Sequence, residues 1–473
     1  MMVKTMKTLM LIVVMFFMCM PLQAQTSTIN WTTVHQIIDG FGAADAEQDS
    51  SMTSAQQSFF FGLGTGQLGL SILRSGVTNG SETSGSCLTV SVSCAGPFVS
   101  DMQAIIAQGG RVIAAPWSPP AAYKTNSDSY CTTGGGNGAL ISGDYGAYAT
   151  WLANFVQSLK TEDGISLYAL SVQNEPDQCQ DYDSALWTAA QLDSFIKTNL
   201  GPTFASDGLS TLIFMPENSG HGSLTGADGG GTCLTDSSCS NYVGGVDWHD
   251  YDVKANSSDT ISSATNPWAS LAKKYWETEV SCLPGADPGP SGCESGWNTD
   301  MTTDGLMWAG IIDDRLVNEN ADAYLYWWLI GEGNTDDQGL ESSTGSIAQR
   351  AYVFGQYSKF IRPGYYRIDA THIPQSGVSV SAYQNTGTKT LVIVATNYTG
   401  SAVSQGFSIT NAPTFSSFTP YITSTSLSLA AQTGVPVSAN SFTYKLPAGS
   451  VTTFVGTGTV VVQPPTNVRA HPF

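Results

Sequence analysis

The sequence predicts an α/β fold, a (β/α)8 TIM barrel with an attached antiparallel side β-domain. Between residues 37 and 330, eight short β-rich apolar runs alternate with longer stretches, some of them helical in pattern. Continuous apolar strands are typical of a parallel sheet that is buried on both faces. After Gly364 the pattern changes to alternating apolar and polar residues, which indicates an antiparallel sheet. An open doubly wound sheet is the alternative for the first part of the chain.

The predicted barrel strands are 37–43, 70–77, 111–117, 167–175, 211–217, 246–251, 274–279 and 323–330. Two of the intervening stretches, 144–162 and 183–202, have the pattern of helices. Asp183 is the predicted N-cap of the second helix, and Gly201-Pro202 is its predicted stop.

The side β-domain is predicted over residues 366–460. Its strand-like segments are 378–400, 415–429 and 440–458. Residues 25–36 are also strand-like, and we expect them to join this domain from the other end of the chain. The catalytic barrel is then residues 37–365, and residues 461–473, which contain Pro-Pro, form a linker-like tail.

Residues 1–24 have the pattern of a secretory signal peptide. Lys4 and Lys7 form a positive segment, an apolar run of twelve residues (9–20) follows, and Leu22-Gln23-Ala24 resembles a cleavage site. Twelve residues are too few to span a bilayer, which needs about 20. A retained anchor is the alternative. We therefore predict a secreted, extracellular chain that begins near Gln25.

Removal of the signal peptide would remove Cys19 and leave eight of the nine cysteines. An even number of cysteines in an exported protein indicates disulfides, although free buried thiols are the alternative. Local spacing favours Cys87–Cys94, Cys233–Cys239 and Cys282–Cys293, which leaves Cys131–Cys179 by elimination. We expect no metal and no cofactor, because there is no CxxC motif and the five histidines are scattered.

The charge balance limits the classes of partner. Charged residues make up 12% of the 473 residues, about half of the roughly 25% usual in soluble domains, and the formal net charge is −20. Such a surface would repel a phosphate backbone or an anionic membrane. We therefore expect a neutral or weakly charged ligand, no nucleic-acid or membrane partner, and a monomer.

The residues that end the predicted strands carry the candidate chemistry, because barrel active sites lie at the C-terminal ends of the strands. Three of these runs end in carboxylates, at Asn174-Glu175, at Glu217 and at Glu277-Thr278-Glu279, and two carry tryptophans near their ends, Trp117 and Trp327-Trp328. We expect Glu217 to be structural, which leaves the fourth and seventh runs as the source of the chemistry. Two carboxylates flanked by tryptophans suit glycoside hydrolysis, in which one carboxyl protonates the leaving oxygen and the other attacks the sugar or activates water.

The chain resembles glycoside hydrolase family 30, a retaining family with a (β/α)8 barrel and a side β-domain. The matching segments are spread over most of the chain after residue 37 and keep the family's order: IDGFGAADAEQ (38–48), GLSILRSGV (69–77), APWSPPAAYKTN (115–126), LSVQNEPD (170–177), WHDYD (248–252), WETEVS (276–281), AYLYWWLI (323–330), YVFGQYSKFIRPGYYRI (352–368) and LPAGSVTTFV (446–455). This resemblance implies that Glu175 is the acid/base and that Glu279 is the nucleophile. It also implies that the N-terminal segment and the residues after about 365 form the side domain.

Further roles follow for residues at the other strand ends. Asn174 is a candidate to bind the sugar 2-hydroxyl, Arg74 to hold Glu279 ionised, and Tyr251 to hydrogen-bond the nucleophile. The other predicted substrate-binding residues are His249, Trp117 and Trp327. The alternatives are Glu277 as the nucleophile, Arg74 as a structural ion pair, and His249 and Tyr251 as residues that line the core.

The motif spellings are most similar to the xylanase branch of the family. Glucuronate-dependent members carry an arginine shortly after the last barrel strand, where it pairs with the branch carboxylate. Residues 329–337 contain no arginine and three acids, so we predict a hydrolase of xylan or xylooligosaccharides that does not depend on glucuronate. The alternatives are another β-linked glycan (β-1,6-glucan, β-1,6-galactan or a glucosylceramide) and a non-catalytic carbohydrate-binding protein.

Overall fold

Eight parallel strands form a closed barrel, which confirms the predicted fold class. The strands pair in the order β9-β2-β3-β4-β5-β6-β7-β8, and β8 pairs again with β9 to close the ring. A short strand, β10, extends the sheet beside β9. The strands are β2 (Gly40–Ala44), β3 (Ile72–Gly76), β4 (Arg111–Ala115), β5 (Ala169–Ser171), β6 (Leu212–Asn218), β7 (Val243–His249), β8 (Lys274–Glu279), β9 (Ala323–Ile330) and β10 (Gly339–Glu341).

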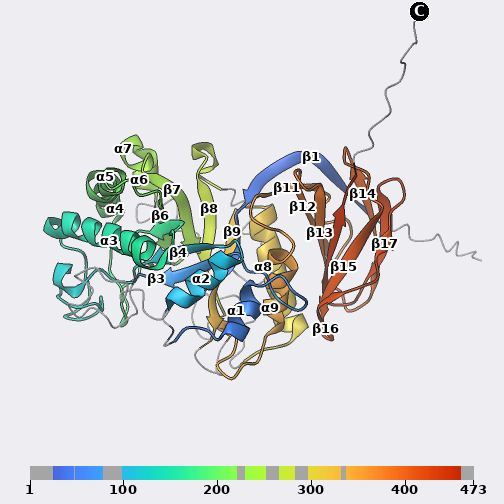
Figure 1. Cartoon of the computed structure of the whole chain (residues 1–473), viewed down its shortest axis with the longest axis horizontal. Helices are drawn as coiled ribbons and strands as arrows, with labels where there is room; N and C mark the ends of the chain where they lie inside the picture. Colours follow the sequence, from blue (N-terminus) through green and yellow to red (C-terminus); the bar gives the residue numbers. More distant parts are fainter. Residues whose placement is uncertain are drawn as a thin grey trace, which may run out of the picture.

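The computed structural model describes residues 25–46, 48, 50–77, 98–220, 230–251, 266–282, 297–331 and 337–459. The predicted signal peptide (1–24) and the predicted tail (461–473) lie outside these residues, as do Cys87, Cys94 and Cys293. Within them the barrel and the side β-domain lie next to each other along the long axis of the molecule (Figure 1).

Helices surround the barrel between its strands: α1 (Ser54–Phe61), α2 (Val99–Ala107), α3 (Tyr145–Asp163), α4 (Ala189–Phe195), α5 (Gly201–Ser206), α6 (Gly231–Thr235), α7 (Ser237–Ser240), α8 (Leu306–Val317) and α9 (Gln349–Ser358). The helix predicted over 144–162 is α3, which spans Tyr145–Asp163. Among the residues that the structure describes, no helix has both the length and the apolar character needed to cross a bilayer.

The helix predicted over 183–202 is wrong at both ends. It begins at Ala189, where the Thr188 side chain caps the helix in a capping box with Gln191. It then continues past Gly201-Pro202 to Ser206 through a π-helical turn, Ile196–Leu200. A proline breaks a regular helix through its clash with the carbonyl four residues earlier, and the wider turn relieves that clash. Gly201 is needed for packing instead, because a Cβ there would overlap the Tyr242 ring.

The side domain is a mostly antiparallel sheet in the order β16-β15-β19-β13-β12-β11-β1-β14-β18, and β17 pairs with β15. Its strands are β1 (Thr26–Ile38), β11 (Tyr365–Ala370), β12 (Val378–Asn385), β13 (Thr390–Asn397), β14 (Val403–Thr410), β15 (Ser417–Ser424), β16 (Leu427–Ala431), β17 (Val435–Pro436), β18 (Ser441–Leu446) and β19 (Ser450–Thr457). The blue β1 reaches from the barrel into the red sheet, where it pairs parallel with β14 and antiparallel with β11 (Figure 1).

The side sheet extends two residues further along β1 than the predicted boundary at residue 36. Ile37 and Ile38 pair with Tyr366 and Tyr365 of β11, and the barrel strand begins only at Gly40. Gly40 has a φ of +146°, and a Cβ at this position would clash with Ser71. The chain therefore changes from one sheet to the other across Asp39-Gly40, where only glycine fits.

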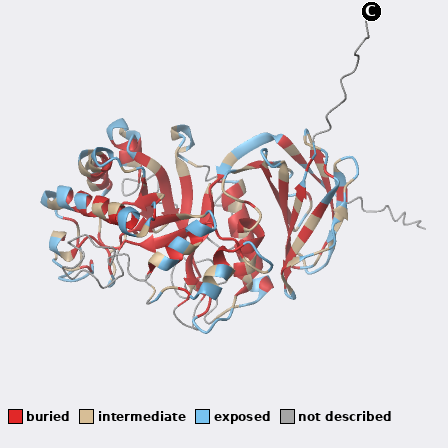
Figure 2. Ribbon diagram, viewed as in Figure 1, coloured by how far each residue is buried: buried red, intermediate tan, exposed pale blue. Residues whose placement is uncertain are grey.

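The apolar core is continuous from the barrel into the side domain (Figure 2). Helix α9 packs against β2 of the barrel and against β15, β16 and β19 of the side sheet. Tyr383, Val392 and Val394 of the side sheet belong to the same buried cluster as the barrel helices, whereas Val380 and Ile393 belong to a second cluster on the other face. This sheet is therefore buried on both faces, and it holds one side of the barrel in place.

Two of the predicted disulfides lie within the described residues. Cys131 and Cys179 are bonded across 48 positions of sequence, and Cys233 and Cys239 across 6. The loop-entropy relation assigns about 4 kcal/mol to the first bond and about 2 kcal/mol to the second. The longer closure therefore contributes more to stability, and it links the loop after β4 to the loop after β5.

Candidate active site

The C-terminal ends of the barrel strands bring the predicted site residues to one end of the barrel. Arg74 lies within β3, and Trp117 follows β4 by two residues. Glu175 follows β5, Glu279 is the last residue of β8, and Trp327 lies in β9. This is the face at which (β/α)8 barrels carry their chemistry.

Arg74 is the centre of the site, and its side chain is completely buried. Its Nε donates to Glu217 Oε1 at 2.9 Å, one terminal nitrogen donates to Glu279 Oε2 at 2.7 Å, and the other donates to Asn174 Oδ1 at 2.6 Å. One planar guanidinium therefore fixes three side chains from three different strand ends, a geometry that lysine could not reproduce.

Glu175 and Glu279 face each other across a short gap. One oxygen of each carboxyl and a ring nitrogen of His249 all lie within 4.8 Å of one another. His249 Nδ1 lies 3.0 Å from Glu175 Oε1, and the Tyr251 hydroxyl donates to Glu279 Oε1 at 2.8 Å. The two carboxyls are therefore close enough to act on a single anomeric carbon.

Tryptophan rings form one wall of the site. The rings of Trp117 and Trp327 lie 5.7 Å apart, and Trp327 stacks on Trp328 at 4.9 Å. The guanidinium of Arg74 lies over the Trp117 ring at 4.7 Å. Each of these tryptophans is buried but keeps a small exposed area. Flat apolar surface of this kind matches the face of a sugar ring.

Comparison with known proteins identifies the family. The model of the "Glycosyl hydrolase family 30 TIM-barrel domain" matches residues 94–273. The glucuronoxylanase XynC of Bacillus subtilis (strain 168) is 30% identical over 442 residues, which cover 92% of this chain and 92% of that protein. The chain belongs to glycoside hydrolase family 30.

Solved structures of family 30 proteins have the same fold as this hydrolase. The subfamily 8 xylanase Xyn30A of Clostridium acetobutylicum superposes with a TM-score of 0.76 at 32% identity, over 92% of this chain and 100% of that one. The catalytic domain of xylanase C from Talaromyces cellulolyticus, also of family 30, superposes with a TM-score of 0.75 at 26% identity, over 91% of this chain and 100% of that one. The barrel with its side sheet is therefore the fold of the family.

In this family 30 hydrolase, the buried positive charges of Arg74 and His249 lie next to the carboxyls of Glu175, Glu217 and Glu279. Burial opposes protonation of His249, but the negative charge of Glu279 and hydrogen bonds to Glu175 and Glu217 raise the pKa of His249 to about 10. Burial acts to raise the pKa of Glu217, yet Arg74 and His249 outweigh it and lower that pKa. Burial raises the pKa of Glu279, and the charges of His249 and Arg74 limit the rise. The cations Arg74 and His249 thus face the carboxylates of Glu217 and Glu279.

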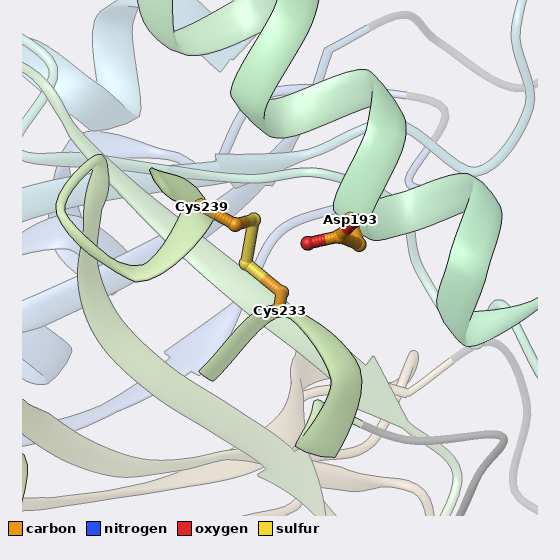
Figure 3. Close-up of side chains that lie close together, drawn as sticks. All are labelled: Asp193, Cys233 and Cys239. Atoms are coloured by element: carbon orange, nitrogen blue, oxygen red, sulfur yellow. A yellow bond between two sulfur atoms is a disulfide. The ribbon is translucent and has the colours of Figure 1, made fainter. Parts of the chain in front are cut away.

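Two groups of side chains among the described residues have the proximity of metal ligands, and chemistry argues against both. In the first group, Glu175, His249 and Glu279, the raised pKa of the histidine favours its protonated form, and Arg74 occupies an oxygen of Glu279. A metal-bound imidazole must be neutral. In the second group, Asp193 faces Cys233 and Cys239, whose sulfurs are joined in a disulfide (Figure 3). A disulfide offers no thiolate to a metal.

The structure separates Glu277 from Glu279, which the sequence leaves as alternative nucleophiles. Glu277 is completely buried and accepts a hydrogen bond from the Leu325 backbone N–H at 2.8 Å. Burial, and then the negative charge of Asp250, raise the pKa of Glu277 well above its ordinary value. A carboxyl that keeps its proton is a poor nucleophile, so the geometry favours Glu279.

All eight predicted site residues lie in or beside this cluster, which also contains two residues that are not among those eight, Glu217 and Tyr182. Glu217 in β6 pairs with Arg74 at 2.9 Å, and its signal in the sequence is an acid at the end of the fifth predicted strand. The Tyr182 hydroxyl lies 3.5 Å from Glu175 Oε2 and comes from a loop without a recognisable motif. Both Glu175 and Glu217 have positive φ, and the Glu175 N–H donates to the Glu217 carbonyl at 3.1 Å.

Proposed function

We propose that this chain is a secreted, retaining β-xylanase that does not depend on glucuronate. The observation that carries the proposal is the pair Glu175 and Glu279, which have carboxyl oxygens within 4.8 Å of each other. Retaining enzymes hold their two carboxyls about 5–5.5 Å apart, whereas inverting enzymes need about 6.5–9.5 Å to admit a water molecule. The short separation supports double displacement.

In the first step, an oxygen of the ionised Glu279 attacks the anomeric carbon and the glycosidic C–O bond breaks. Glu175 gives its proton to the leaving oxygen, so that a glycosyl ester on Glu279 and a free sugar hydroxyl are formed. In the second step, water attacks the same carbon, Glu175 accepts a proton from that water, and Glu279 leaves as a carboxylate. Arg74 and Tyr251 donate hydrogen bonds to Glu279, and these bonds stabilise its charge each time it forms.

Neutral xylan is supported as the substrate by the tryptophan wall and by the relatives. The family 30 proteins of Clostridium acetobutylicum and Talaromyces cellulolyticus are described as xylanases. The Oδ1 atom of Asn174 accepts a hydrogen bond from Arg74, so the Nδ2 group is the part of this amide that can donate to a sugar hydroxyl. The Bacillus subtilis relative is named a glucuronoxylanase, and the absence of a requirement for the glucuronic acid branch therefore rests on other residues of this chain.

Independence from glucuronate is supported by the charges that follow β9. Residues 331–337 carry three acids and no arginine. Arg350 contacts Asp337, the last of these residues, but the side chain of Arg350 is completely buried and forms ion pairs with Asp304 at 3.0 Å and with Asp337 at 3.2 Å. A guanidinium that is already paired and shielded from solvent cannot receive a branch carboxylate.

The test is a substrate panel combined with product stereochemistry. We expect hydrolysis of linear xylooligosaccharides and arabinoxylan at rates within about tenfold of glucuronoxylan, and NMR of the first product should show the β-anomer. A strict requirement for glucuronate, or a preference for β-1,6-glucan, would refute the proposal that the enzyme acts on xylan without dependence on glucuronate. A first product in the α-form would refute retention, and a parent enzyme that only binds glycans would refute catalysis.

Secretion is supported by the charged, apolar and small-residue pattern of residues 1–24. Expression of the full chain in a bacterium that exports such proteins should yield an extracellular enzyme. Its N-terminal sequence should begin near Gln25. An enzyme retained in the membrane fraction with residues 1–24 intact would contradict this proposal.

A further inference from the structure

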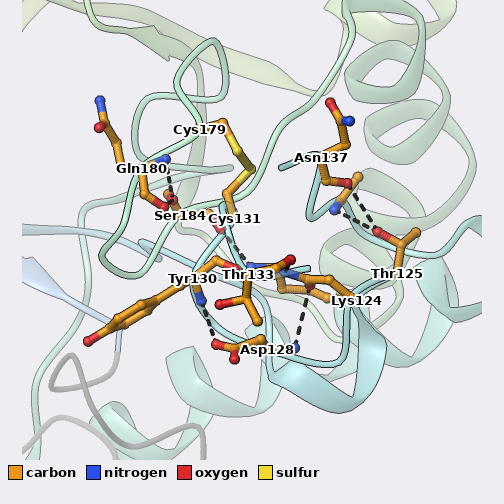
Figure 4. Close-up of a disulfide and its surroundings, with 12 residues drawn as sticks. Lys124, Thr125, Asp128, Tyr130, Cys131, Thr133, Asn137, Cys179, Gln180 and Ser184 are labelled. Atoms are coloured by element: carbon orange, nitrogen blue, oxygen red, sulfur yellow. Dashed lines mark hydrogen bonds between the residues drawn. A yellow bond between two sulfur atoms is a disulfide. The ribbon is translucent and has the colours of Figure 1, made fainter. Parts of the chain in front are cut away.

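Two long loops at the active-site end of the barrel are joined to each other. One comprises residues 116–144, between β4 and α3, and the other comprises residues 172–188, between β5 and α4. The disulfide Cys131–Cys179 connects them, with Cα atoms 5.1 Å apart (Figure 4). The Thr132 N–H also donates to the Gln180 carbonyl at 3.2 Å. We call these two segments the joined loops.

A buried lysine adds a second connection between the joined loops. Lys124 is 1% exposed, and its Nζ donates to the carbonyls of Ser129 and Ser184, both at 2.6 Å. The Ser184 N–H in turn donates to the Ser129 carbonyl at 3.1 Å. Residues 179 and 184 are therefore both fixed to the neighbouring loop, and the short segment between them has little freedom to move.

Tyr182 lies in this fixed segment, and its side chain reaches the proposed acid/base. Glu175 Oε1 faces the completely buried His249 at 3.0 Å, whereas Oε2 faces the Tyr182 hydroxyl at 3.5 Å. Tyr182 is 44% exposed. Oε2 is therefore on the open side of the carboxyl, where a leaving group can approach, and Tyr182 lies on that same side.

We propose that Tyr182 is a positioning residue for proton transfer, and that the joined loops present its ring to the sugar that departs. This inference rests on the proposed function, because it assigns a role within the same site. Oε1 lies 3.0 Å from His249 Nδ1, and the raised pKa of His249 favours a proton on that nitrogen, so Oε2 is the oxygen left to carry the transferable proton. The Tyr182 hydroxyl fixes the direction of Oε2, and the exposed ring provides an apolar surface beside the leaving sugar.

The phenol of Tyr182 is suited to act as a donor. Burial of the hydroxyl, and then the negative charges of Glu175 and Glu279, raise the pKa of Tyr182, so the phenol keeps its proton throughout the reaction. When Glu175 gives its proton to the leaving oxygen, a negative charge forms on Oε2. A hydrogen bond to the charged form then becomes stronger than it was to the neutral acid, which is the requirement for help in the transition state.

The experiment compares two leaving groups in Tyr182→Phe and Tyr182→Ala. Xylohexaose requires both protonation and a contact for the departing sugar, and 2,4-dinitrophenyl β-xylobioside requires neither. We expect kcat/KM on xylohexaose to fall about fivefold in Tyr182→Phe and about 30-fold in Tyr182→Ala. Activity on the aryl glycoside should stay within about twofold of the parent. The alkaline limb of the pH–rate profile on xylohexaose should move to higher pH in Tyr182→Phe, because the carboxylate loses a donor.

Tyr130→Ala is the matched control. Tyr130 is also 44% exposed, it lies beside Cys131 in the joined loops, and its ring points away from the disulfide (Figure 4). We expect this variant to resemble the parent on both substrates. Equal losses on both substrates, an unshifted alkaline limb, or an equal effect of Tyr130→Ala would overturn the inference. If Tyr182→Ala does not fold, Tyr182→Phe decides alone. A parent enzyme inactive on both substrates would instead refute the proposed function.

Discussion

Replacing Glu279 with glutamine should lower kcat on xylooligosaccharides by more than about 10⁴-fold. The variant keeps the shape of the side chain but removes the charge that attacks the anomeric carbon. It also replaces one of the two oxygens that accept from Arg74 at 2.7 Å and from Tyr251 at 2.8 Å with an amide nitrogen, which cannot accept. Steady-state hydrolysis is the measurement. In Glu279→Ala, which removes the side chain, added formate should partly restore the cleavage of an activated aryl glycoside, because a small carboxylate can occupy the vacated place.

Glu277→Gln is the matched control for this experiment, because Glu277 lies two residues away in the same strand. Its raised pKa keeps the carboxyl neutral, and a glutamine oxygen can still accept the Leu325 N–H. We therefore expect Glu277→Gln to keep activity within about tenfold of the parent. If Glu277→Gln loses as much activity as Glu279→Gln, the assignment of the nucleophile is wrong.

The barrel could be predicted from the sequence because each strand is short, apolar and bounded by polar residues. All eight predicted runs overlap a barrel strand of the structure. The boundaries were harder to predict where tertiary contacts override local signals. Ile37 and Ile38 have the same apolar character as the residues that follow, and only pairing with β11 assigns them to the side sheet. Gly201-Pro202 is a stop signal in isolation, and the π-helical turn before it cancels that signal.

The carboxylate pair could also be predicted, because strand ends meet at one face of a barrel and the motifs there are dense. The contacts among the side chains of the site could not be predicted from the sequence. Arg74 binds Glu217, Glu279 and Asn174, and nothing in the sequence assigns three partners to one arginine. Tyr182 belongs to a loop whose path depends on the disulfide and on Lys124. Side chains that arrive from loops depend on long-range closure, which local patterns do not encode.

Replacing Arg74 with methionine should destabilise the protein by about 3–5 kcal/mol at pH 7, because two buried carboxylates lose their shared partner. Arg74 lowers the pKa of Glu217 below its unfolded value, so the parent gains stability from this pair above about pH 4.5 and loses it as pH falls further. In the variant, the carboxyls can take up protons at pH 4.5 at little cost. The difference in unfolding free energy between parent and variant should therefore be largest at pH 7 and smaller at pH 4.5, as measured by denaturant titration.

Arg111→Met is the control for a general effect of removing an arginine from the barrel. Arg111 begins β4 at the opposite end of the strand, is 28% exposed, and pairs with Asp39 at 2.8 Å. Partial exposure screens this pair, so its loss should cost about 1 kcal/mol. Arg74→Lys should fall between the parent and Arg74→Met, since it keeps the charge but not the planar fork that reaches three acceptors. If Arg74→Met is as stable as Arg111→Met at pH 7, the buried cluster does not depend on Arg74 for its charge balance.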